Sequence, residues 1–223
     1  MIGAKLGVLG LGSRSTFYYL SELNRLYHQA KGDYSTCPLV LLNTDFNAIN
    51  SLLPNRSKAL DAILQTYVYE IEAFHIQQLL IPNITLHETT DRLLITKNVF
   101  HPVHLSLKKI KEKHWNKVVL FGSLFSMNAT YLKDQFKANG IEVLLPSQDD
   151  MQCIDLVRQD IYSGTETTEL IKKYHSIINF YTAQYPVILS CTELSVLKPK
   201  GNKNLLDMAD VQIEEAIKQV LLF

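Results

Sequence analysis

The stretch Val187-Ile188-Leu189-Ser190-Cys191-Thr192-Glu193-Leu194 decides the fold. Three apolar residues run directly into a hydroxyl, a thiol, a second hydroxyl and a carboxylate. A short apolar run bounded by polar residues is typical of a buried strand in a parallel sheet. Open α/β folds bind their ligands at the carboxyl ends of such strands. We therefore expect residues 190–193 to stand at a ligand-binding edge of the sheet.

Cys191 is the candidate reactive side chain within this stretch. A thiol becomes a thiolate base or nucleophile when nearby donors lower its pKa. Without such donors, a buried cysteine is simply a small apolar residue in a core. Cys191 is predicted at a strand end among polar neighbours, whereas Cys37 and Cys153 lack such surroundings. We therefore interpret Cys191 as functional.

Strand and helix signals alternate along the whole chain. Apolar residues between positions 57 and 74, for example, recur at the three- and four-residue spacing of a helix with one buried face. A serine, Ser13 or Ser15, is expected to cap the first helix. Strands are predicted over residues 6–10, 38–42, 79–81, 117–121, 141–145 and 187–189, and helices over residues 15–27, 57–74, 103–113, 128–138, 151–161, 167–184 and 209–222. The alternation predicts an α/β fold of parallel sheets flanked by helices.

An internal duplication indicates that the chain contains two similar halves. Residues 5–10 echo residues 117–122, and residues 79–83 echo residues 187–191. We therefore expect two pseudo-symmetric α/β domains with a cleft between them. Residues 1–98 plus 206–223 would form the first domain, and residues 99–205 the second. Asn83 and Cys191 would then occupy equivalent positions on opposite walls of the cleft.

Composition excludes several classes of partner. The 22 basic and 22 acidic residues of this 223-residue chain cancel, which leaves no electrostatic footprint for nucleic acid or an anionic membrane. No apolar run approaches the roughly 20 residues of a membrane span. The N-terminal residues lack the pattern of a signal peptide. The three cysteines are widely spaced and show no metal-type spacing, which favours a reduced, cytoplasmic setting.

Several motifs occur in an order that resembles the cofactor-independent aspartate/glutamate racemase superfamily. The most specific one is residues 190–194, close to that family's Gly-Cys-Thr-Glu-Leu. The family's other motif, usually Pro-Cys-Asn-Thr-Ala-His, appears as residues 82–87, where Thr85 and His87 match and Asn83 replaces the cysteine. The weaker matches are Gly10-Leu11-Gly12 with Thr16, Asn43-Thr44-Asp45-Phe46, Pro54-Asn55-Arg56 and Gly122-Ser123-Leu124-Phe125-Ser126-Met127.

The resemblance implies an amino-acid racemase that uses no PLP, nucleotide or metal. It further implies that a small amino acid or dicarboxylate is the ligand and that the protein forms a homodimer. Inversion needs one group to remove the α-proton and another to return a proton to the opposite face. Cys191 would be one of these groups, whereas the Asn83 carboxamide does not ionise near neutral pH and would instead orient substrate or hold a water. The implied substrate-binding residues are Gly10, Arg56, Thr85, His87, Ser123, Ser126, Thr192 and Glu193.

The missing second thiol leaves three functions open. The protein could be a racemase selective for one enantiomer, or a one-thiol relative such as a decarboxylase or isomerase. It could also be a catalytically silent protein that binds an amino acid or dicarboxylate. Tyr162 stands where the family often has a lysine for the distal carboxylate, and Gln212 where a histidine is common. Arg14 is either a replacement charge or a surface residue.

The Gly10-Leu11-Gly12 turn also has a rival interpretation as a dinucleotide-binding loop. Ser15 stands where the third glycine or alanine of that fingerprint belongs. The acidic residue expected at the end of the second strand is also misplaced, since Asp45 lies too far along the chain. A cradle for a small anion is the better interpretation.

Overall fold

The computed structural model describes residues 5–53 and 56–222, and it divides into two compact units. One unit consists of Met1–His101 with Gln212–Phe223, and the other of Pro102–Val211. Each unit contains one four-stranded sheet in which all pairings are parallel. The two sheets have equivalent strand orders, β2-β1-β3-β4 and β6-β5-β7-β8. The predicted fold, two pseudo-symmetric α/β units with parallel sheets flanked by helices, is confirmed.

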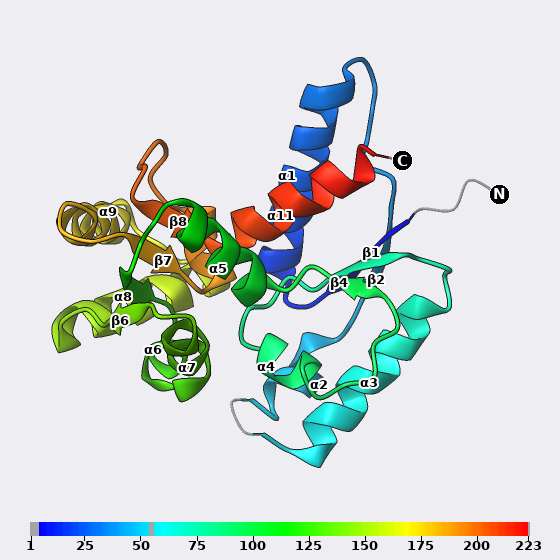
Figure 1. The fold of residues 1–223 in the computed structure, drawn as a ribbon, viewed down its shortest axis with the longest axis horizontal. Helices are drawn as coiled ribbons and strands as arrows, with labels where there is room; N and C mark the ends of the chain where they lie inside the picture. The colour runs from blue at the N-terminus through cyan, green and yellow to red at the C-terminus, as the bar shows by residue number, and fades with distance from the viewer. Residues whose placement is uncertain (1–4, 54–55, 223) are drawn as a thin grey trace. The chain divides into compact units, whose positions relative to one another are not determined.

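The first unit is built around β1, whose five residues are all buried. Helix α3 packs against β1, and its Leu64 and Ile71 join Leu9 and Ile81 in the core of that face. Helices α1 and α11 lie side by side on the opposite side of the sheet from α3 (Figure 1). The Tyr19 hydroxyl of α1 donates to Gln212 Oε1 of α11 at 2.5 Å. The elements are β1 Leu6–Gly10, α1 Ser13–Lys31, β2 Leu39–Asn43, α2 Phe46–Asn50, α3 Lys58–Glu72, β3 Gln78–Leu80, α4 His87–Thr90 and β4 Asn98–Val99.

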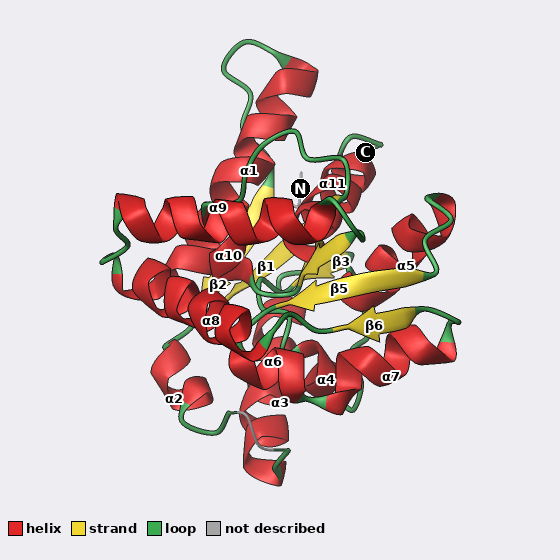
Figure 2. Ribbon diagram, turned by 90° about the vertical axis from the view of Figure 1, so that its left-hand side faces the viewer, coloured by secondary structure: helices red, strands yellow, loops and turns green. Residues whose placement is uncertain are grey.

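The second unit repeats this plan around β5 and β7. Helices α8 and α9 pack together over the sheet face that carries Val119 and Leu189, and Ile154 and Ile178 fill the layer between (Figure 2). Helix α7 packs against β6 and against α5. The elements are α5 Pro102–Glu112, β5 Lys117–Phe121, α6 Leu124–Asn128, α7 Thr130–Ala138, β6 Glu142–Leu144, α8 Gln148–Ser163, α9 Thr168–Thr182, β7 Val187–Leu189, α10 Thr192–Val196 and β8 Leu205–Asp207. Helix α11, Met208–Val220, begins in this unit and from Gln212 onward belongs to the first.

A glycine stands at the carboxyl end of the first strand of each unit, Gly10 in β1 and Gly122 just after β5. A larger residue would collide with a neighbouring side chain at both positions. A Cβ on Gly10 would lie 2.6 Å from Asn43 Oδ1, and a Cβ on Gly122 would lie 2.6 Å from Ser190 Oγ. The Ser190 backbone N–H and hydroxyl both donate to the Phe121 carbonyl at 2.8 Å. The two chain segments that leave β5 and β7 are therefore in direct contact.

Several predicted elements were wrong in detail. Two edge strands, β4 and β8, were missed because neither Asn98–Val99 nor Leu205–Asp207 contains a run of three apolar residues. The helix predicted over residues 128–138 is α7, which begins at Thr130, and the preceding helix α6 was missed. Ala129 separates the two helices in an extended conformation. Neither serine caps α1: Gly12 occupies the N-cap position, and the Ser15 hydroxyl donates to the Leu11 carbonyl at 2.7 Å.

None of the helices in the described part of the chain has both the length and the apolar character needed to cross a membrane.

The substitution Gly122→Ala should destabilise the protein by about 1–3 kcal/mol, the typical cost of overpacking. The added methyl would collide with Ser190 Oγ and would also lie 3.1 Å from Ser126 Cβ. Urea denaturation measures the effect, with Ser190→Ala as the control. The double variant Gly122→Ala/Ser190→Ala lacks Ser190 Oγ, the atom closest to the added methyl. Its loss in free energy of unfolding should therefore be smaller than the sum of the losses in the two single variants. Strict additivity would contradict the proposed collision.

Candidate active site

Cys191 stands immediately after β7 at the carboxyl edge of the second sheet. It is the N-cap residue of α10 and has an extended backbone conformation. Its side chain is partly buried and packs against the core cluster that contains Ile154 and Val157 of α8. Cys37 and Cys153 are buried instead, and burial raises the pKa of Cys37 to about 11. Of the three thiols, Cys191 is the one at a strand end.

The Cys191 thiol donates a hydrogen bond to a carboxylate. Its Sγ lies 3.0 Å from Glu193 Oε2, an oxygen that also lies 3.4 Å from the Thr192 hydroxyl. Burial raises the pKa of Cys191 well above its usual value, and the charge and hydrogen bond of Glu193 raise it further. The surroundings of Cys191 therefore do not, on balance, lower the pKa of its thiol. Cys191 rests as a protonated thiol, which suits a proton donor.

A buried aspartate and an arginine on α8, which the sequence interpretation missed, lie close to this thiol. Asp155 accepts from Arg158 Nε at 2.8 Å and from the Leu124 backbone N–H at 3.0 Å, which ties α8 to the start of α6. Burial opposes ionisation of Asp155, but these bonds lower its pKa on balance. Arg158 interacts electrostatically with both Cys191 and Glu193. The available signal was an acidic residue on the apolar face of a helix, followed three residues later by an arginine.

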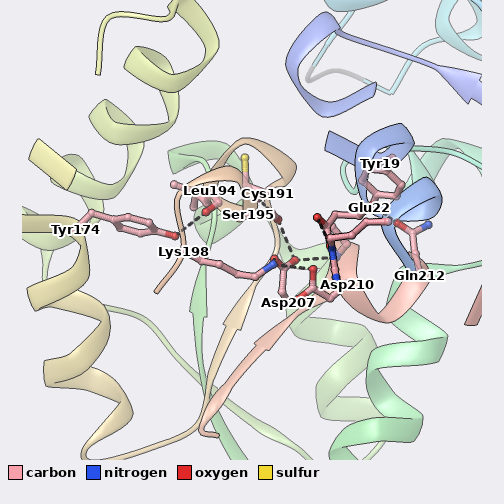
Figure 3. Close-up of polar contacts among 12 residues, drawn as sticks. Tyr19, Glu22, Tyr174, Cys191, Leu194, Ser195, Lys198, Asp207, Asp210 and Gln212 are labelled. Carbon is pink, nitrogen blue, oxygen red and sulfur yellow. Dashed lines mark hydrogen bonds and ion pairs between the residues drawn. The ribbon is translucent and has the colours of Figure 1, made fainter. Parts of the chain in front are cut away.

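A buried ionic network fixes the chain segment after Cys191 (Figure 3). The Lys198 ammonium lies 2.5 Å from Asp207 Oδ2 and 2.7 Å from Asp210 Oδ1. The Ser195 hydroxyl donates to Asp207 Oδ1 at 2.9 Å and lies 3.4 Å from the Cys191 carbonyl. Burial raises the pKa of Asp207, and Lys198 opposes this shift. Figure 3 shows the Cys191 sulfur pointing away from Asp207, so the network positions the backbone of this motif rather than its thiol.

Ser123 and Ser126, both predicted to bind substrate, bond to each other. Ser123 caps α6 by accepting from the Ser126 backbone N–H at 3.0 Å, and the two hydroxyls lie 2.9 Å apart. They follow β5, the neighbour of β7, so they share the sheet edge of Cys191. Thr192 also lies at this edge and is almost completely buried.

In the first unit, Asn83 occupies the position equivalent to that of Cys191. Leu80 of β3 pairs with Val8 of β1, and Ile188 of β7 pairs with Leu120 of β5. Asn83 follows Leu80 by three residues, as Cys191 follows Ile188.

The Asn83 side chain hydrogen-bonds within the fold through its carbonyl oxygen and not through its amide N–H groups, among the residues that the structure describes. Its Oδ1 accepts from the Leu86 backbone N–H at 3.1 Å. Its amide N–H groups and the Thr85 hydroxyl, both partly buried, have no hydrogen-bond partner among the residues that the structure describes. Both groups remain able to contact a ligand.

His87, another predicted substrate residue, lies inside the first unit. Its ring is fully buried, and Nε2 lies 3.3 Å from the Ile81 carbonyl and 3.4 Å from Gln212 Nε2. The His101 ring contacts it edge-on, with centroids 4.7 Å apart. Gln212, which stands where a histidine was expected, also donates to the Phe100 carbonyl at 2.6 Å. These side chains form a buried polar network beneath the strand ends.

Arg56 lies on the surface and forms an ion pair with Glu88, with Nε 2.8 Å from Oε1. Its side chain is 68% exposed. The two residues before it in the predicted Pro-x-Arg motif, Pro54 and Asn55, fall outside the described residues. Gly10 is buried at the end of β1, and Tyr162 is exposed on α8. Thus the structure gathers the second-unit residues at one sheet edge, whereas the His87 ring is buried inside the first unit and the Arg56 side chain is exposed and paired with Glu88.

Across residues 5–53 and 56–222, no group of three or more His, Cys, Asp or Glu side chains is arranged to hold a metal ion.

Comparison with known proteins identifies a family over nearly the whole chain. The profile of the Asp/Glu/Hydantoin racemase family matches residues 8–216. Among curated protein sequences, none matches significantly.

Solved structures share the fold at low sequence identity. An aspartate racemase homologue from Pyrococcus horikoshii OT3 superposes with a TM-score of 0.80 and 17% identity, over 98% of this chain and 99% of that chain. The Picrophilus torridus aspartate racemase gives 0.79 and 18%, over 97% and 94%. A variant of arylmalonate decarboxylase gives 0.50 and 8%, over 96% and 92%. At these identities the likeness concerns the fold alone.

The substitution Glu193→Gln should lower the pKa of Cys191, because it removes a negative charge beside the thiol. The pH midpoint for alkylation by iodoacetamide should therefore move to lower pH, by about 1 unit. The rate can be followed by mass spectrometry of the Cys191 peptide. Glu169→Gln, which neutralises an exposed carboxylate on α9, is the matched control and should leave the midpoint in place. A midpoint that does not move in Glu193→Gln would show that the carboxylate does not govern this thiol.

Proposed function

Because the chain belongs to the Asp/Glu/Hydantoin racemase family, we propose that it is a cofactor-independent amino-acid racemase of the aspartate/glutamate type. In this proposal Cys191 is the acid/base thiol, and the ligand is a small amino acid or dicarboxylate. The supporting observation is the Cys191 thiol at the carboxyl end of β7, hydrogen-bonded to Glu193 at 3.0 Å.

Because Cys191 is protonated at rest, its thiol can donate a proton directly but cannot remove one without first losing its own. A protonated thiol can deliver its proton to a carbanion that forms on its side of the substrate. To remove a proton instead, the thiol must first release its own, and Glu193 Oε2 is the acceptor within hydrogen-bond distance. The positive α-ammonium group of an amino-acid substrate would also favour the thiolate. Glu193 is therefore assigned to proton exchange with the thiol.

Asn83 is proposed to orient substrate or a water, because a carboxamide cannot serve as the second base. Its register equivalence to Cys191 and the resemblance of residues 82–87 to the family motif support this assignment. Thr85, Thr192, Ser123, Ser126 and Gly10 are proposed to contact substrate. Arg56 would do so only after leaving Glu88, and His87 would act through the groups that its ring supports.

The protein is further proposed to form a homodimer and to work in the cytoplasm. The family resemblance supports a homodimer. All three cysteines are unpaired, which suits the reducing conditions of a cytoplasm.

A one-thiol decarboxylase or isomerase is the second candidate function. It is favoured by the protonated resting state of Cys191 together with Asn83, because loss of carbon dioxide leaves a carbanion that needs a single proton donor. The likeness in fold to arylmalonate decarboxylase is compatible with it. A silent binding protein would have the same residues but catalyse neither reaction.

Incubation with single enantiomers of aspartate and glutamate in heavy water should test the function directly. NMR should show loss of the α-proton signal, and Cys191→Ala should abolish that loss, because no other group at this strand end replaces the thiol. The variants Cys37→Ser and Cys153→Ala are the matched controls and should retain exchange. Full exchange in Cys191→Ala would refute the mechanism. Carbon dioxide release from an α-substituted malonate without α-proton exchange would favour the decarboxylase, and binding without either reaction the silent protein.

A protein with one thiol should exchange the α-proton of one enantiomer faster than it inverts the centre. Asn83→Cys should raise the rate of inversion relative to exchange, because it adds an ionisable group at the equivalent strand end. Asn83→Ser, which is equally small but does not ionise near neutral pH, is the control and should not raise inversion. If the unmodified protein exchanges both enantiomers equally, with inversion keeping pace, a second base exists elsewhere.

A further inference from the structure

We propose that Arg158, held in place by Asp155, is a positioning residue whose guanidinium stabilises the thiolate form of Cys191. This inference rests on the proposed function for its purpose, since it concerns the same thiol. It adds to that function the residue that opposes Glu193 in setting the charge of the thiol.

The first step of the argument is that Arg158 is fixed on the side of α8 near Cys191. Helix α10 packs against α8, and Cys191 itself contacts the core cluster that contains Ile154 and Val157. Arg158 follows Ile154 by four residues on the same helix, so the two side chains lie on the same face of α8. Its Nε donates to Asp155 Oδ1 at 2.8 Å, and Asp155 is in turn fixed by the Leu124 N–H and by Gln159 Nε2 at 2.7 Å.

The second step is that the rest of the guanidinium is not engaged. In the described part of the chain, Arg158 hydrogen-bonds through Nε alone, and its two terminal amino groups have no hydrogen-bond partner. The side chain is 27% exposed, so its positive charge is only partly screened by water. It interacts favourably with both Cys191 and Glu193.

The third step is the balance of charges around the thiol. Glu193 on α10 disfavours the thiolate, and Arg158 on α8 favours it. Asp155 is compensated by Arg158, and Asp207 of β8 by Lys198. Tyr174 on α9 faces the same region, but burial raises the pKa of its phenol, so it remains neutral. The short helix α6 carries no ionisable side chain. Arg158 is therefore the cation that acts on Cys191 from the packed elements.

The test measures the pH profile of Cys191 alkylation by iodoacetamide in a Cys37→Ser/Cys153→Ala background. Arg158→Gln should move the midpoint to higher pH by about 1 unit. At pH values below both midpoints, alkylation should then be about tenfold slower. Arg158→Lys retains the charge and should recover most of the wild-type profile.

The matched control is Arg25→Gln, which removes an arginine from another i,i+3 ion pair, with Glu22 on α1. It should leave the midpoint unchanged. Arg158→Gln leaves the Asp155 carboxylate without its ion-pair partner, and that negative charge could itself shift the midpoint. Comparing Asp155→Asn/Arg158→Gln with Asp155→Asn removes this effect and isolates the charge of Arg158. This double variant also serves if Arg158→Gln does not fold.

An unchanged midpoint in Arg158→Gln, or in the double variant relative to Asp155→Asn, would overturn the inference. So would a shift in Arg158→Lys as large as that in Arg158→Gln, because a merely structural role would explain it. The readout is thiol reactivity, so the proposed racemase function can fail by lack of α-proton exchange while the midpoint still shifts. Conversely, α-proton exchange by the wild-type protein together with an unchanged alkylation midpoint in Arg158→Gln would support the racemase function and contradict the role of Arg158.

Discussion

The pairing of β5 with β7 is the constraint on which the arrangement of the candidate site depends. It brings the segments that leave the two strands so close together that Gly122 has no room for a side chain. The Ser190 N–H and hydroxyl then close the edge of the sheet on the Phe121 carbonyl. Cys191 follows directly, so its position is set by main-chain pairing and not by its own contacts.

The charges beside Cys191 give this position its chemical character. Lys198, Asp207 and Ser195 satisfy the buried polar groups around the α10 segment, which would otherwise be costly to bury. Glu193 opposes ionisation of the thiol and Arg158 favours it. Burial and Glu193 together outweigh Arg158, so the thiol stays protonated at rest. Proton donation from one side of a substrate is the chemistry that this balance suits.

The two units show how one supersecondary plan can carry different chemistry. Their strand orders are the same, and the registers of β3 and β7 make Asn83 and Cys191 equivalent. In one unit the equivalent side chain accepts a backbone hydrogen bond, and in the other it is an ionisable thiol. Because the residues beneath the strand ends maintain the fold, the residue at the tip can change without loss of the architecture.

The sequence by itself determined the α/β class, six of the strands and the prominence of Cys191, because these depend on local apolar periodicity and on residue order. It did not reveal β4 or β8, because Asn98–Val99 and Leu205–Asp207 each lack a run of three apolar residues. Only the tertiary structure paired Arg56 with Glu88, buried His87 and brought Arg158 near Cys191. It also showed that burial and Glu193 raise the pKa of Cys191. Burial and long-range charge depend on which helices pack together, and no local pattern in the sequence records that packing.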